Sequence, residues 1–147
     1  MQYSIADFVL DIAQNSLEAD ASLVTIDYIE DERMITVMIG DNGKGMDEET
    51  LAKVKDPFFT DGVKHEKRKV GLGIPFLIQA TESAGGEFDI VSNTEDGTSV
   101  TFSFDKSNID CPIAGNLPSL FRSLMIYEGN YDLLIHRVYD DRSWRVT

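Results

Sequence analysis

Disulfide bonds and long apolar segments are both missing from this chain of 147 residues. The single cysteine, Cys111, has no second cysteine for an internal disulfide and cannot build a zinc knuckle. No apolar run approaches the ~20 residues that a membrane-spanning helix needs. The N-terminus also lacks the pattern of a signal peptide. We therefore expect a cytoplasmic protein without a membrane partner.

Positive charge is also scarce. The sequence has 13 lysine and arginine residues against 26 aspartate and glutamate residues, which gives a formal net charge of -13. Such a charge repels nucleic acid and anionic membranes, so neither is expected as a primary partner. The length suits one domain, and 42% hydrophobic residues are enough to build its core.

The first helix is expected from Ile5 to about Glu18, because apolar residues recur there at helical spacing. Ser4, followed three residues later by Asp7, resembles a capping box at its start. Polar residues follow the other side of this helix at three- and four-residue steps, and so share one face: Asp7, Asp11, Asn15 and Glu18.

Runs rich in β-forming residues come in two pairs in the first two thirds of the chain. Runs 23–29 and 34–39 are joined by an acidic turn and predict one antiparallel hairpin. Runs 87–92 and 99–104 predict a second hairpin.

Two more helices are expected between these hairpins. Asp47 is placed to cap a short helix, with Met46 and Leu51 on either side of the cap as a hydrophobic staple. Pro75 fits the first turn of a third helix that runs to about Ala84, where two glycines end it.

The remaining segments are a loop and a C-terminal extension. Residues 58–70 lack periodicity and carry a run of charges, which favours a mobile loop large enough to act as a lid. Residues 105–147 are predicted to form an amphipathic helix at 120–127 and a β-hairpin of 133–138 with 143–146.

The order of these elements predicts an α/β (α+β) two-layer sandwich with a mixed, largely antiparallel sheet and helices on one face. The main part of this domain would occupy residues 3–104. We expect the extension, residues 105–147, to pack on the same domain and to cover part of the other face of the sheet.

Asp41 ends the second predicted strand and is followed by two glycines, Gly43 and Gly45. A carboxylate accepts hydrogen bonds, so it suits the exocyclic amine of adenine and would repel the oxygen of guanine. The glycines would let the backbone approach a base. The alternatives are an Asx turn that ends the strand, or, less favoured, a calcium loop in which Gly43 replaces an oxygen ligand.

Asn15 can offer its side-chain oxygen to Mg²⁺, which prefers oxygen ligands and keeps several waters. Asp11, one helical turn earlier, is placed to orient a water or a hydroxyl nucleophile. The alternative for both residues is a solvated polar face on an amphipathic helix.

The segment Gly71-Leu72-Gly73 leads into the third helix, where its amides could surround phosphate oxygens. No P-loop pattern is present, and such glycine turns are common. The basic run 64–69 could offset triphosphate charge or simply be solvated. Phe58 could form a hinge beside the lid, or belong to the core. We expect the two histidines, His65 and His136, to be structural or solvated.

Together these motifs resemble the GHKL superfamily of ATP-binding domains, which includes histidine kinases, type II topoisomerases, a mismatch-repair ATPase and a heat-shock chaperone. Residues 11–21 resemble the mismatch-repair version of the first motif, whereas 56–60 and 71–74 look like histidine-kinase versions of later motifs. The resemblance covers roughly residues 3–104 and implies a Bergerat-type fold that binds ATP and Mg²⁺.

This resemblance also implies roles for individual residues. Asn15 would bind Mg²⁺, Asp41 would bind adenine, and Thr98 would support the adenine carboxylate, often through water. Asp11 would be the catalytic residue. The implied nucleotide-binding residues are Asn15, Asp41, Gly43, Gly45, Met46, Phe58, Gly71, Leu72, Gly73 and Thr98.

Two departures from the family pattern affect the expected function. Asp11 stands where the family has glutamate, and this shorter side chain is expected to impair ATP hydrolysis more than ATP binding. No helix hairpin with a phosphoacceptor histidine precedes the ATP-binding segment. We therefore expect a short stand-alone member that phosphorylates an unidentified protein in trans or hydrolyses ATP slowly. The alternative is a nucleotide-dependent protein-binding module, similar to anti-sigma factors, with little turnover. A homodimer is compatible with both.

Overall fold

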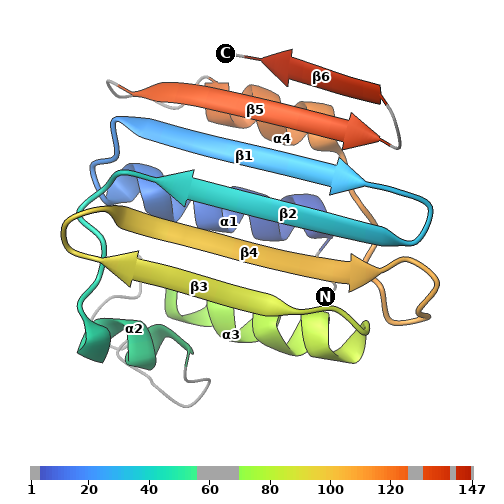
Figure 1. Cartoon of the computed structure of the whole chain (residues 1–147), viewed down its shortest axis with the longest axis horizontal. Helices are drawn as coiled ribbons and strands as arrows, with labels where there is room; N and C mark the ends of the chain where they lie inside the picture. The colour runs from blue at the N-terminus through green and yellow to red at the C-terminus, as the bar shows by residue number, and fades with distance from the viewer. Residues whose placement is uncertain (1–3, 56–69, 126–130, 140–141, 147) are drawn as a thin grey trace.

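The computed structural model of the chain describes residues 4–55, 70–125, 131–139 and 142–146, and for 70–73 and 142–146 it describes the backbone. One mixed sheet forms one layer of the described structure (Figure 1). Its six strands lie in the order β3-β4-β2-β1-β5-β6. The strands are β1 (Leu23–Glu30), β2 (Met34–Asp41), β3 (Phe88–Asn93), β4 (Gly97–Asp105), β5 (Asp132–Tyr139) and β6 (Arg142–Val146). Among the described strands only the β1–β5 pair is parallel, which confirms the predicted mixed, largely antiparallel sheet.

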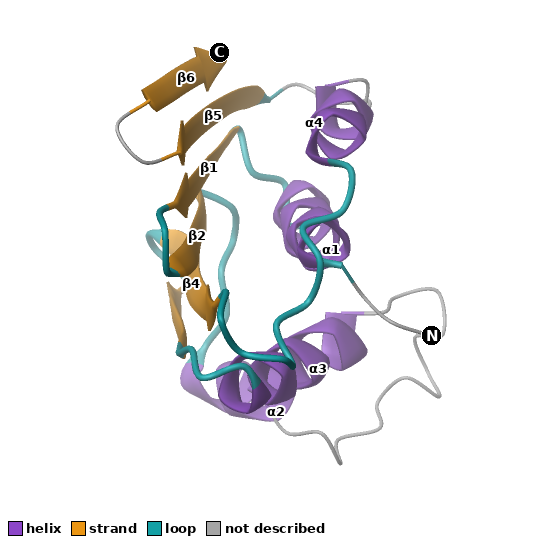
Figure 2. Cartoon of the chain, turned by 90° about the vertical axis from the view of Figure 1, so that its right-hand side faces the viewer, coloured by secondary structure: helices purple, strands orange, loops and turns teal. Residues whose placement is uncertain are grey.

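The helices lie on one face of the sheet, as predicted (Figure 2). They are α1 (Ile5–Glu18), α2 (Glu48–Lys55), α3 (Val70–Ser83) and α4 (Leu117–Met125). Helix α1 lies between α3 and α4 and packs against both. None of the helices in the described ranges is both long enough and apolar enough to cross a bilayer.

The start of α1 follows the predicted capping box. The Asp7 amide donates to Ser4 Oγ at 3.1 Å, and the Ser4 amide donates to Asp7 Oδ2 at 2.8 Å. Two further amides at this end donate to the C-terminal extension: Ile5 to the Ile113 carbonyl at 2.8 Å, and Ala6 to the Ala114 carbonyl at 2.9 Å. Amides that a helix leaves unpaired at its start are therefore satisfied.

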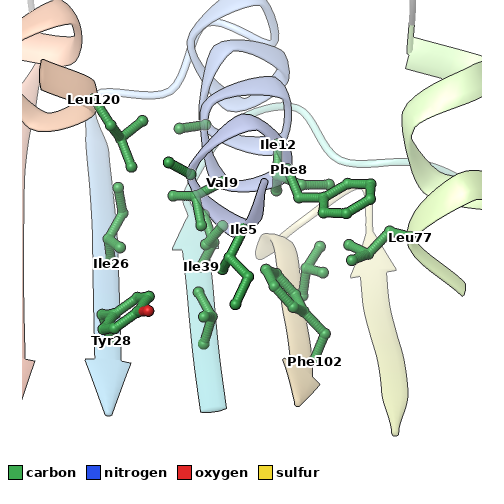
Figure 3. Close-up of a cluster of buried hydrophobic side chains, with 14 of the residues drawn as sticks. Ile5, Phe8, Val9, Ile12, Ile26, Tyr28, Ile39, Leu77, Phe102 and Leu120 are labelled. Carbon is green, nitrogen blue, oxygen red and sulfur yellow. The ribbon is translucent and has the colours of Figure 1, made fainter. Parts of the chain in front are cut away.

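The core lies between the helices and the sheet (Figure 3). Alternate residues of each central strand are buried, as in β2, where Ile35, Val37 and Ile39 face the helices. The apolar face of α1 packs onto these strands, so each layer buries the other. Phe102 and Phe104 meet edge to face on β4, with ring centroids 5.9 Å apart.

The start of the third helix differs from the prediction. Helix α3 begins at Val70, and Pro75 lies inside it. A proline lacks an amide hydrogen, so here it removes one bond, to the carbonyl four residues earlier. The first four amides of a helix have no intrahelical acceptor, so a proline at one of these positions costs no hydrogen bond. Pro75 lies beyond them, so its position does not mark the start of α3. The end is as predicted: Gly85 has φ +72°, and the Gly86 amide donates to the Thr81 carbonyl at 2.8 Å.

The C-terminal extension forms the expected helix and hairpin, but the prediction that it covers the other face of the sheet is wrong. Strand β5 pairs along the edge of β1, and α4 packs beside α1 on the face that already carries helices. Pairing satisfies the backbone groups of β1, which would otherwise be an open edge. Helix α4 meanwhile buries Leu117, Leu120 and Leu124.

Candidate functional site

Asp41 is the last residue of β2 and lies opposite Thr98 of β4 in the antiparallel ladder. Its side chain is half-buried, and both carboxylate oxygens are held by the protein. Oδ2 accepts from the Ser16 hydroxyl at 2.5 Å, and Oδ1 accepts from the Gly43 amide at 2.8 Å. Each carboxylate oxygen can accept two hydrogen bonds, so this carboxylate can accept further donors.

Ser16 is a site residue that the sequence did not reveal. It is only 4% exposed on α1, and its hydroxyl also lies 3.3 Å from the Ile12 carbonyl. A hydroxyl has one proton to donate, and the shorter distance to Asp41 favours that acceptor. One sequence signal points to Ser16, because it lies four residues after Ile12, where the helical pattern calls for an apolar residue.

The predicted base-lining glycines pack against the protein itself. A Cβ on Gly43 would lie 2.8 Å from the Ala19 carbonyl oxygen. Gly45 has φ +66°, and a Cβ there would lie 1.8 Å from the Asn93 carbonyl oxygen. These positions therefore need glycine for the loop to fit between α1 and the β3–β4 turn, before any ligand is considered.

A chain of hydroxyl groups holds the neighbouring strands. Thr98 Oγ1 lies 2.7 Å from Ser92 Oγ, and Ser92 Oγ accepts from the Met46 amide at 2.9 Å. These hydrogen bonds connect β4, β3 and the segment that leads into α2. Ser92, like Ser16, was not predicted, although a small polar residue at a position that faces the helices is a signal that strand alternation could have revealed.

The loop after Asp41 is also tied to the turn between α1 and β1. Asn42 Oδ1 accepts from the amides of Ser22 and Leu23, each at 2.9 Å. The Lys44 amide donates to the Ala19 carbonyl at 3.0 Å. The end of β2, the end of α1 and the loop that follows Asp41 therefore form one rigid corner.

Asn15 and Asp11 lie on α1, on the side predicted from their spacing, and both are half-buried. Asn15 immediately precedes Ser16, so it is next to the residue that holds Asp41. Within the described ranges, no cluster of three or more histidine, cysteine, aspartate or glutamate residues forms a metal cage.

The two other predicted parts of the site are the lid, with Phe58, and the glycine segment 71–73. Phe58 and most of the expected lid, through residue 69, lie outside the described residues. Gly71, Leu72 and Gly73 do not form a turn before the helix, because they belong to the first turn of α3. The first four amides of an α-helix have no intrahelical acceptor, so helical geometry at these residues still leaves amides for an anion.

The fold and this corner define a two-layer α/β domain. Residues 3–108 match the family described as histidine kinase-, DNA gyrase B-, and HSP90-like ATPase. Because the match covers well over half of the chain, the protein belongs to this family and carries its ATP-binding domain.

The curated relatives include a kinase and sensor proteins. The chain is 28% identical to sporulation kinase A of Bacillus subtilis over 107 residues, which are 71% of this chain and 17% of that protein. It is 31% identical to sensor protein KdpD of Clostridium acetobutylicum over 87 residues, 58% of this chain and 10% of that protein. It is also 31% identical to the C4-dicarboxylate transport sensor protein DctB of Pseudomonas aeruginosa over 71 residues, 48% of this chain and 11% of that protein. The similarity therefore spans a small part of each relative.

Proposed function

We propose that this protein is a Mg²⁺-dependent ATP-binding domain that acts in trans in the cytoplasm, as a regulatory protein kinase or a slow ATPase. The carboxylate of Asp41 carries this proposal. Ser16 and Gly43 hold it at the end of β2, at 2.5 and 2.8 Å, and Thr98 lies opposite it in the ladder. The family match supplies the nucleotide class.

Asp41 is suited to adenine because its two acceptor oxygens are held in place and a carboxylate has no donor of its own. The exocyclic amine of adenine can donate to a carboxylate, whereas guanine presents an oxygen at the same position. Thr98 Oγ1 and Ser92 Oγ are 2.7 Å apart, and Thr98 lies opposite Asp41 in the ladder. The two hydroxyl groups are therefore placed to hold a water between the protein and the base.

The phosphates would lie toward α1 and the start of α3. Asn15 would offer its amide oxygen to Mg²⁺, and the first-turn amides of α3 would donate to phosphate oxygens. Bound Mg²⁺ would neutralise part of the phosphate charge. The protein has a formal charge of -13, so the cation and these amides would offset repulsion of the triphosphate.

A melting experiment with Mg²⁺-ATP tests nucleotide binding. At ATP about 100-fold above its dissociation constant, mass action stabilises the folded state by about 2.7 kcal/mol. We expect the melting temperature to rise with Mg²⁺-ATP and to rise less with ATP and a chelator. No shift up to several millimolar Mg²⁺-ATP would remove the basis of the proposal.

Asp11 decides between turnover and simple binding. A general base must lie within about 2.6–3.2 Å of the proton it accepts, directly or through one water. A carboxylate that is one methylene shorter than glutamate misses this distance unless the helix moves. We therefore expect very slow hydrolysis by the wild type, faster turnover in Asp11→Glu, and almost unchanged ATP affinity in Asp11→Ala. Wild-type turnover at an ordinary ATPase rate, unaffected by Asp11→Ala, would remove Asp11 from the mechanism.

The second candidate function is a nucleotide-dependent protein-binding module with little turnover, and the aspartate at position 11 favours it. The discriminating measurement is transfer of γ-labelled phosphate from ATP to any protein in an extract of the native cell. Labelled protein supports the kinase. A partner retained with ATP and released without it, with no label transferred, supports the module.

A further inference from the structure

Strand β3 forms one edge of the six-stranded sheet (Figure 1). The Ser103 amide donates to the Glu87 carbonyl at 2.9 Å, which sets the phase of the β3–β4 ladder. Hydrogen-bonded pairs alternate in an antiparallel ladder, so the backbone groups of Asp89 and Val91 point toward β4. Those of Phe88 and Ile90 point to the open side, where no backbone bond from the described residues reaches them.

An open groove of about 570 Å³ runs beside this edge. That volume is in the ~300–1,000 Å³ range of ligand sites. Its lining residues come from the end of α2, one face of α3 and β3: Lys55, Ile78, Glu82, Glu87, Phe88, Asp89 and Ile90. Ile78 and Phe88 remain half-exposed there, so apolar surface is available beside the free backbone groups.

The rim of the groove is acidic. Glu82, Glu87 and Asp89 are all exposed, and none of them forms an ion pair with a described residue. Lys55 is the one basic residue among the lining residues. The rim therefore attracts a cationic partner.

The alternation of β3 determines which side chains a partner strand needs. Phe88 and Ile90 face the helices, whereas Glu87 and Asp89 belong to the opposite face. Side chains directly opposite each other on paired strands interact, so a partner strand should be aliphatic toward the helices and basic on the other face. It would also supply the missing backbone partners of Phe88 and Ile90.

We propose that the β3 edge binds an extended segment of another protein in which lysine or arginine alternates with aliphatic residues, as an added strand. A second copy of this chain does not suit the edge. Antiparallel pairing of two copies centred on Phe88 would place Glu87 of one copy opposite Asp89 of the other, and like charges opposite each other destabilise a pair. The proposal goes beyond ATP binding and supplies a docking surface for a protein partner.

A labelled peptide tests this edge without any nucleotide. The probe is acetyl-Lys-Val-Lys-Val-Lys-Val-Lys-amide, and its control, Lys-Lys-Val-Val-Val-Lys-Lys, has the same composition without alternation. By fluorescence anisotropy, we expect the alternating peptide to bind at least tenfold more tightly. In hydrogen exchange by NMR, the amides of Phe88 and Ile90 should slow on binding, because they become paired.

Charge-reversal variants localise the binding. Glu87→Lys with Asp89→Lys should weaken the probe at least tenfold. The matched control, Glu32→Lys with Asp132→Lys, changes the net charge equally at exposed sites in the β1–β2 turn and on β5, strands apart from β3, and should leave binding nearly unchanged. Asp41→Asn should also bind the probe normally, which separates this test from that of the nucleotide site.

Three results would overturn the proposal. Equal binding of both peptides would mean that charge alone attracts them. Unchanged exchange at Phe88 and Ile90 would place the peptide elsewhere. A dimer in sedimentation that dissociates when Glu87 and Asp89 are replaced by lysine would show that a second copy occupies the edge.

Discussion

The two ends of α1 are held in different ways. At its start, Ser4 and Asp7 cap each other, and the carbonyls of the C-terminal extension accept from two amides. At its end, the side chain of Ser16 donates to Asp41, on which the proposed base recognition depends. The first set of contacts fixes the helix, whereas the second fixes a functional group. Stability and nucleotide affinity should therefore respond to substitutions at different ends of the same helix.

The largest effect is expected at Gly45, in the loop that completes the site end. Alanine there would place its Cβ 1.8 Å from the Asn93 carbonyl oxygen at φ +66°. We expect Gly45→Ala to lower the free energy of unfolding by about 3 kcal/mol or more, from backbone strain and collision together. Urea denaturation measures this loss.

Gly85 provides the matched control for Gly45. Its φ is +72°, but the nearest heavy atom to an added Cβ is 3.4 Å away. Gly85→Ala should therefore cost only the backbone strain, about 1 kcal/mol. Equal losses in the two variants would mean that close packing at Asn93 does not hold the loop.

Ser16→Ala tests the site end of α1 directly. It removes the hydroxyl that donates to Asp41 at 2.5 Å and leaves the helix intact. A hydrogen bond to a charged group contributes about 1.5–3 kcal/mol, and only part of this serves to hold Asp41 for the nucleotide, so ATP affinity should fall about three- to tenfold. Titration calorimetry measures the change. An unchanged affinity would show that Asp41 needs no support from α1.

Ser4→Ala makes the same substitution at the opposite end. Loss of the N-cap should cost about 1 kcal/mol of stability. For a chain of this length, that corresponds to a fall of about 2–4 °C in melting temperature. ATP affinity should stay the same, because the Ser4 hydroxyl binds the start of α1, at the end of the helix opposite Ser16. A parallel loss of affinity would show that the two ends are coupled.

The smallest effect concerns pH. The Thr50 backbone amide, which donates to Asp47 at 2.8 Å, lowers the pKa of the Asp47 carboxyl below its ordinary value. A lowered folded-state pKa stabilises the protein above the unfolded pKa, and this contribution is lost as the pH falls through the folded value. Melting temperatures of the wild type should therefore decline below about pH 4. Asp47→Asn should decline slightly less steeply, and an identical pH profile would contradict this role.

Local signals in the sequence were enough to predict most of the fold. The capping box at Ser4, the hairpin across residues 30–34 and the glycine end of α3 each depend on a few consecutive residues. The position of the C-terminal extension could not be predicted from local signals. Strand β5 could reach either the edge of β1 or the open face, and the choice depends on backbone groups that only the assembled sheet leaves unpaired.

The site was predictable in part for the same reason. Asp41, Gly43 and Gly45 lie in one short motif, and Thr98 was predicted from its resemblance to a family residue. Ser16 and Ser92 were missed because their partners are distant in sequence. Ser16 bonds to a residue 25 positions away, and Ser92 to one 46 positions away. A polar residue on a buried face of one element can mark each serine, but it does not identify the distant partner.

Adenine recognition by Asp41 is tested by titration calorimetry of ATP and GTP against the wild type, Asp41→Asn and Lys44→Ala. We expect ATP to bind in the micromolar to millimolar range and GTP to bind far more weakly. Asp41→Asn should lose about ten- to 150-fold in ATP affinity, as expected for a hydrogen bond to a charged group. Lys44→Ala should lose little, because its exposed side chain is not part of the corner that holds Asp41. Equal losses in the two variants, or equal affinities for ATP and GTP, would contradict adenine recognition by Asp41.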